Sequence, residues 1–161
     1  MDITITYADL YDTVARSLSI IGKRSTDDNG NLLFRDITLG TRETEIAYDY
    51  LRTAAVDMAS ELTDFISVSQ STDAAVTITV DVPTNWNQQL LPFLQSAVDA
   101  YCVAYTLYSW FVITAPRIAD KYLADAQRQK SNIIRLAWQK KKPAGSQTSP
   151  FDISSTVTRN S

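Results

Sequence analysis

Residues 100–113 read AYCVAYTLYSWFVI, a run that would place apolar side chains on every side of a helix. A helix that is hydrophobic all round must be covered by protein on all its faces. Fourteen residues are short for a membrane span, so we expect no membrane association. The chain has only 161 residues to cover this helix. We therefore expect copies of the chain to associate.

Three tyrosines form a stripe on the same helix at spacings of four and three residues. Such a stripe is most often part of a core, and a small-molecule pocket is a further alternative. Tyrosine also suits protein interfaces, because it combines apolar area with a polar tip. We therefore consider this helix a candidate subunit interface. Its candidate interface residues are Tyr101, Tyr105, Tyr108, Trp110 and Phe111.

Hydrophobic periodicity predicts a mainly α-helical fold with four helices. The first runs from Tyr7 to Ile21, with Thr6 opening it and Gly22 ending it. The others cover residues 42–65, 91–113 and 116–141, and Ile46, Tyr50, Ala54, Met58 and Leu62 line one face of the second. Alternation within residues 65–82 predicts a small β-hairpin with its turn at 70–74. Residues 1–142 thus form a helical domain, and residues 143–161 an extended C-terminal tail.

Composition argues against catalysis. The chain has no histidine, which removes the commonest general base and the commonest metal ligand. Its four glycines are too far apart for a phosphate-binding loop. The single cysteine, Cys102, lies in the apolar helix and is interpreted as a small buried hydrophobe. The DDNGN run at residues 27–31 does not match the spacing of a calcium loop. We expect no cofactor, no metal and no enzyme activity.

Charge divides the chain in two. Residues 1–115 hold 6 Lys/Arg and 15 Asp/Glu, whereas residues 116–161 hold 9 and 3. This polarity favours head-to-tail contacts between copies, or a basic end that faces an acidic partner. The tail is polar, with few apolar anchors, and we expect it to dock on another polypeptide. The candidate docking residues are Lys140, Lys141, Lys142, Phe151, Ile153 and Val157.

The order of these elements resembles the head–tail adaptor (connector) proteins of tailed bacteriophages. The layout is a short helix, an arm, a long helix, a hairpin, an apolar helix and a polar helix. The apolar helix opens near Leu91-Pro92 and carries the Tyr-x-x-Tyr of residues 105–108, and the polar helix runs from Ile118 to Trp138. The resemblance covers residues 7–140, whereas the Asp-Asn-Gly arm and the serine-rich tail depart from a minimal adaptor.

The resemblance implies a structural protein of the virion neck, assembled in the cytoplasm of a bacterial host. Such adaptors form a ring, commonly of twelve copies, beneath the portal, and they join the portal to the stopper or tail. Genomic DNA passes through the lumen of the ring without specific binding. The family has no catalytic residues, and its C-terminal segments commonly pack on the portal or on a neighbouring subunit. Residues 143–161 occupy the matching place in this chain.

A channel that passes DNA should not grip it, so we expect an acidic or mixed lumen. The lumen candidates are Asp57, Glu61, Asp64, Asp73 and Asp81. Three alternatives stay open. The chain could be another neck or tail-completion ring protein. A helical DNA-binding regulator would need a basic recognition helix with a tight-turn partner. A carboxylate enzyme would need two acids in one pocket, whereas an acidic helix face such as that of Asp57, Glu61 and Asp64 is more usually solvated.

Overall fold

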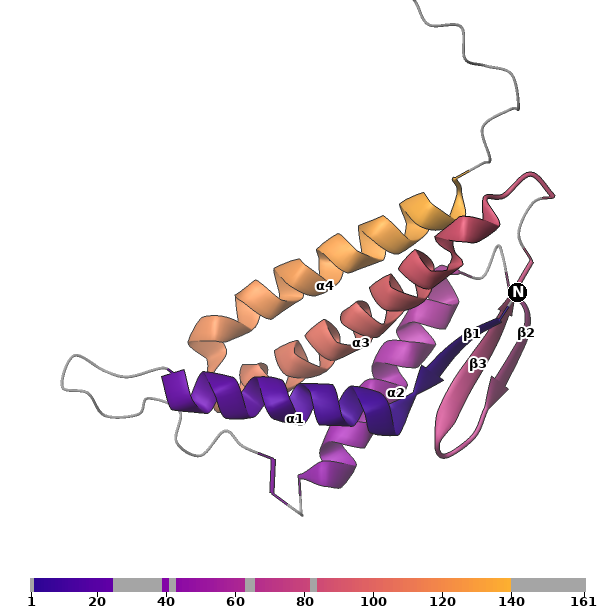
Figure 1. Ribbon diagram of the computed structural model, residues 1–161. Coiled ribbons are helices and arrows are strands. Elements are labelled where there is room, and N and C mark those ends of the chain that lie inside the picture. The colour runs from indigo at the N-terminus through magenta and orange to yellow at the C-terminus, as the bar shows by residue number, and fades with distance from the viewer. Residues whose placement is uncertain (1, 25–38, 41–42, 63–65, 82–83, 140–161) are drawn as a thin grey trace, which may run out of the picture.

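The computed structural model describes residues 2–24, 39–40, 43–62, 66–81 and 84–139. Over these residues the fold is mainly α-helical, as predicted, with four helices and a small three-stranded antiparallel sheet (Figure 1). The helices are α1 (Tyr7–Arg24), α2 (Thr44–Glu61), α3 (Leu91–Thr114) and α4 (Pro116–Ala137), and a 3-10 turn, η2 (Gln88–Leu90), precedes α3. The strands are β1 (Asp2–Thr6), β2 (Ile66–Ser71) and β3 (Ala75–Val80).

Helix α3 is the centre of the fold. It contacts α1, α2, α4, β1 and η2, and α4 runs back alongside it after the turn at Ala115 (Figure 1). The segment Gln88–Thr114 is long and apolar enough to cross a membrane, but a buried core helix has the same length and composition. The chain therefore supplies far more cover for α3 than the sequence led us to expect. The large apolar side chains of α3 that stay exposed lie toward its two ends, at Phe93, Val112 and Ile113.

The predicted hairpin is present as β2 and β3, and its turn is tightened by a hydrogen bond from the Thr72 backbone N–H to the Ala75 carbonyl at 2.8 Å. Strand β1, which was not predicted, pairs with β3 and places β3 in the middle of the sheet. Ile3 and Ile5 pair with Ile78 and Val76 and are fully buried. Thr6 belongs to this strand, so helix α1 begins where the strand ends.

Two helix details differ from the sequence prediction. Gly22 does not end α1, which continues to Arg24 with Gly22 buried inside it. The buried face of α2 is also rotated relative to the predicted one. It consists of Ala47, Leu51, Ala54, Ala55 and Met58, whereas Ile46 is 44% exposed. A strict four-residue repeat drifts around a helix of 3.6 residues per turn, so the predicted stripe leaves the buried face at its N-terminal end.

The buried side chains form two clusters along α3. The larger cluster joins the sheet to α2, the first half of α3 and the last turns of α4. The smaller one lies where the second half of α1, the end of α3 and the start of α4 meet, and it contains Val14, Leu18, Leu107, Trp110, Phe111, Ala115 and Ala119. These two clusters hold α3 and α4 side by side and thereby position the surfaces described next.

Candidate interaction surfaces

The fold buries three of the predicted subunit-interface aromatic residues and leaves the other two partly exposed. Tyr101, Trp110 and Phe111 are buried within their own chain, at 2%, 7% and 0% exposure. They leave no surface for a neighbouring copy, and the interface prediction is corrected for these three. Tyr105 and Tyr108 are half-buried, with ring centroids 6.2 Å apart in an edge-on arrangement. The stripe is thus mainly core, because α2 and α4 cover the side of α3 on which it begins.

Two carboxylates of the acidic face of α2, Asp57 and Glu61, contact α4 at a partly exposed position. Lys130 of α4 forms ion pairs with Glu61 at 2.8 Å and with Asp57 at 3.3 Å, and Tyr101 donates a hydrogen bond to the Asp57 carboxylate. The hydrogen bond to Glu61 is the main reason why the pKa of Lys130 is raised. Burial, and then the contact with Asp57, raise the pKa of Tyr101. Asp57 and Glu61 therefore act as internal partners of Lys130, which sequence periodicity could not reveal because α4 lies 70 residues away.

Of the other lumen candidates, Asp73 lies in the hairpin turn and Asp81 follows β3, and both are exposed. Asp64 lies outside the described residues. The predicted tail and its docking residues, from Lys140 to Val157, also lie outside them.

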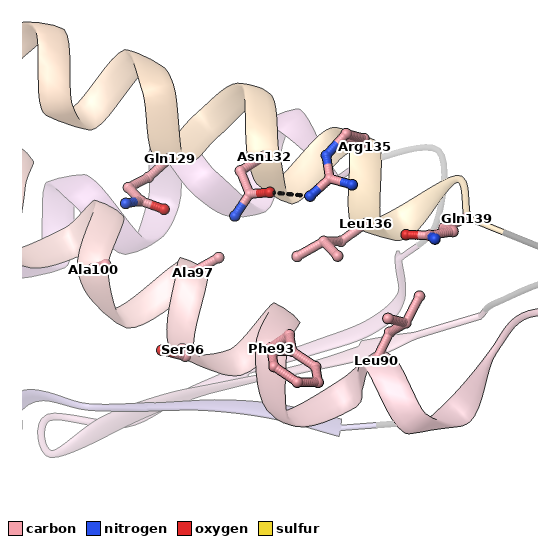
Figure 2. Close-up of a pocket in the computed structure, with 10 residues that line it drawn as sticks. All are labelled: Leu90, Phe93, Ser96, Ala97, Ala100, Gln129, Asn132, Arg135, Leu136 and Gln139. Atoms are coloured by element: carbon pink, nitrogen blue, oxygen red, sulfur yellow. Dashed lines mark hydrogen bonds between the residues drawn. The ribbon is translucent and has the colours of Figure 1, made fainter.

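A groove runs between the start of α3 and the end of α4, with a volume of about 430 Å³ (Figure 2). Figure 2 shows Phe93 and Leu90 on the α3 side and Leu136 on the α4 side. The groove exists because α3 presents small side chains, Ser96, Ala97 and Ala100, where α4 passes. Phe93 is 64% exposed at its edge. We call this feature the α3–α4 groove, and its lining residues are Leu90, Phe93, Ser96, Ala97, Ala100, Gln129, Asn132, Arg135, Leu136 and Gln139.

A second depression, the acidic hollow, adjoins the groove and shares Ser96, Ala100 and Gln129 with it. Its volume is about 550 Å³, and its charged lining residues are Asp9, Asp99, Asp125 and Arg128. Arg128 pairs with Asp125 at 3.0 Å, whereas the described ion pairs include neither Asp9 nor Asp99. Burial raises the pKa of Asp99, and Asp9 raises it further, against the hydrogen bond from Gln95. The hollow is therefore a place where added positive charge would be favourable.

The far end of α3 carries a different surface, which we call the apolar tip and define as Val112 and Ile113. They are 46% and 73% exposed in the last turn of the helix. The ends of α1 and α3 and the start of α4 gather at this side of the molecule (Figure 1). Arg117 and Lys121, both exposed, follow the tip in the first turns of α4. The sequence showed this apolar run but gave no sign of which of its residues would remain outside.

Chemical features of a reaction centre are sparse among the residues that the structure describes. No group of three or more His, Cys, Asp or Glu side chains in them could hold a metal ion. The Cys102 thiol is fully buried, and burial raises its pKa to about 12. Comparisons with protein-family models, with curated proteins and with solved structures gave no match to this chain.

Proposed function

We propose that this chain is a structural subunit of a homo-oligomeric ring in the neck of a tailed bacteriophage. In this role it joins the portal to the stopper or tail and leaves a channel for DNA. The order of helix, arm, helix, hairpin, apolar helix and polar helix supports the proposal, because it is the layout on which the resemblance to head–tail adaptors rests. Leu91 opens α3 and Pro92 lies in its first turn, where proline is well tolerated.

One observation supports the assembly of copies into a ring. The two ends of α3 present unlike surfaces, with the groove at its N-terminal end and the apolar tip at its C-terminal end, and the acidic hollow lies between them. An interface between unlike patches is heterologous, and such contacts close into rings when the rotation between neighbours permits. A two-fold dimer could use the same surfaces only with the two α3 helices antiparallel, and it would then give no assembly larger than a pair. The charge division along the sequence is consistent with the same head-to-tail arrangement.

Within this proposal Asp57, Glu61, Asp73 and Asp81 are the lumen candidates among the described residues, and Asp73 and Asp81 are those without a described ion pair. An acidic channel wall would repel phosphates and let DNA slide past. The tail of residues 143–161 would dock on the portal or on the adjoining ring, with Phe151 and Ile153 as apolar anchors and Lys140 to Lys142 near acidic groups.

A DNA-binding role is less well supported by the contacts of α4, the basic helix. Lys130 is paired with Asp57 and Glu61, Arg128 with Asp125, and Arg135 donates to Asn132 at 2.7 Å. These cations are already engaged within the chain, which lowers their value as phosphate contacts. A regulatory DNA-binding module would nevertheless show salt-dependent binding of duplex DNA by the isolated chain.

The deciding experiment is a mass measurement of the full chain, alone and after incubation with portal-bearing particles. We expect a closed ring in at least one of these states, about 216 kDa for twelve 18.0-kDa chains, and retention on the particles. A chain that stays monomeric in both states and does not bind the particles would overturn the proposal. Salt-dependent DNA binding in that same sample would support the regulatory alternative.

A further inference from the structure

We infer that the apolar tip of one copy seats in the α3–α4 groove of the next copy, with Arg117 of the first facing the acidic hollow of the second. The inference rests on the proposed ring and names the contact that would build it. The occupant of the groove is thus a second copy of this chain.

The first support is the match in chemistry between tip and groove. Val112 and Ile113 form an exposed aliphatic pair at the end of a helix, and such side chains gain free energy when they leave water. On its α3 side the groove offers Leu90, Phe93 and two alanines, with Leu136 at its base, whereas Gln129, Asn132, Arg135 and Gln139 of α4 form a polar rim. An exposed Phe beside a depression of small side chains is a surface that a bulky aliphatic group from outside can fill.

The second support is charge. The acidic hollow has three carboxylates against one guanidinium, and that guanidinium pairs with Asp125. Asp99 accepts a hydrogen bond from Gln95 but has no cation beside it among the described ion pairs, and its pKa is raised by burial and further by Asp9. Arg117 is exposed in the first turn of α4, directly after the tip. A cation delivered by a neighbouring copy would therefore complement the hollow.

The third support is spacing. Asp99 lies six residues beyond Phe93, or about 9 Å along α3. Arg117 follows Ile113 by four residues and carries a long side chain. When Ile113 lies beside Phe93, Arg117 reaches the hollow in the orientation in which α4 of the first copy begins over Asp99 of the second, and the charge exchange described below tests that orientation.

The occupant must come from another molecule. Phe93 and Ile113 are 20 residues apart on one rigid helix, a separation of about 30 Å. A subunit cannot bend its own tip into its own groove without breaking α3. Each copy has one tip and one groove, so every copy can use both and the contact can propagate from head to tail. A reciprocal two-fold pair with antiparallel α3 helices would use the same two contacts, and the cross-linking below separates the two arrangements, because a closed pair gives no product beyond the dimer.

Cysteine cross-linking tests the contact in the full chain, assembled alone or on portal-bearing particles. The variant carrying both Phe93→Cys and Ile113→Cys should give, with a short bis-maleimide, a ladder of products beyond the dimer. Either single variant should give no cross-linked product through this contact, because its one cysteine faces a native residue of the neighbouring copy. The native Cys102 is buried and contributes little background. The control pairs Ile113→Cys with Val56→Cys, an exposed position on α2 outside both surfaces, and should give no ladder.

A charge exchange supplies an independent readout. Arg117→Glu and Asp9→Lys should each weaken association about tenfold, and the two changes combined should recover most of the loss. Asp12→Lys, an exposed change on the same helix outside the hollow, should recover nothing when combined with Arg117→Glu. Circular dichroism of each variant checks that the helices are retained, so that a folding defect is not mistaken for a lost contact.

The outcomes separate the two proposals. A wild-type ring without the ladder, or without recovery in the charge exchange, overturns the tip-in-groove contact and leaves the ring in place. Cross-linking of Phe93→Cys to Phe151→Cys in place of Ile113→Cys would show that the tail fills the groove, and it would overturn the inference equally. A wild-type chain that neither assembles nor binds portal-bearing particles overturns the proposed function itself.

Discussion

The indole N–H of Trp86 donates a hydrogen bond to the backbone carbonyl of Leu136 at 3.0 Å, across 50 residues of sequence. Trp86 precedes α3 and is buried, and Leu136 lies in the last turn of α4. This bond therefore fastens the end of α4 to the segment that leads into α3. Because Leu136 also lines the α3–α4 groove, the bond helps to set the position of one groove wall.

Replacing Trp86 with Phe should lower the free energy of unfolding by about 1–2 kcal/mol, since it removes the donor and leaves a gap in the core. The Leu136 carbonyl keeps the Gln139 backbone N–H as a second donor at 3.2 Å, which limits the loss. Urea denaturation measures the change. Phe93→Leu, at an exposed aromatic on α3, is the control and should change stability by less than about 0.5 kcal/mol. Equal effects of the two variants would show that the bond contributes nothing.

The ion cluster between α2 and α4 gives a second prediction. Lys130→Met would leave Asp57 and Glu61 close together without their cation. All three side chains are about one-third exposed, so solvent screens the charges and we expect a loss of about 1–2 kcal/mol. Arg128→Met breaks a more exposed pair on the same helix and should cost about 0.5 kcal/mol or less. If Lys130→Met lowers the free energy of unfolding by no more than Arg128→Met does, the cluster stabilises the fold no more than an ordinary exposed ion pair.

The raised pKa of Asp99 predicts that the stability of the free chain depends on pH. Burial raises its pKa above the ordinary value, so the folded state holds a proton to higher pH than the unfolded state does. Stability from this group is present at low pH and is lost as the pH rises from about 4 through the folded pKa. Asp99→Asn should therefore be more stable than wild type at pH 7, with the advantage shrinking toward pH 4. Thermal unfolding between pH 4 and 8 tests this, with exposed Asp12→Asn as the control. A constant difference across that range would contradict the expectation.

The tail gives the fourth prediction. Both buried clusters lie within residues 3–137, so deleting residues 146–161 should leave the helical fold intact. Circular dichroism should show the same helical signal with a similar melting temperature. If the tail docks on the portal or the adjoining ring, the truncated chain should co-sediment more weakly with portal-bearing particles. Unchanged attachment would show that the tail is not a docking segment, and a lost helical signal would show that the core extends into it.

Local patterns in the sequence determined much of the architecture. The helical periods, Pro92 and Pro116 at helix starts, and the alternating runs around residues 66–80 together predicted four helices and the hairpin. Strand β1 was not predicted, although DITIT alternates polar and apolar β-branched residues as a half-buried strand does. Such a short strand is held by its pairing with β3, which lies more than 70 residues away.

For the candidate surfaces too, some properties could be predicted from the sequence and others depended on the tertiary structure. Sequence alone established that residues 100–113 are too apolar to face water and that charge is unequal along the chain, because both properties belong to the residues themselves. Only the tertiary structure decided that Tyr101, Trp110 and Phe111 turn inward, whereas Val112 and Ile113 remain outside. The tertiary structure alone pairs Lys130 with Asp57 and Glu61. It also places Asp9 close enough to Asp99 to raise the pKa of Asp99. Which face of a helix is covered depends on the neighbours that pack against it, and those neighbours come from distant parts of the chain.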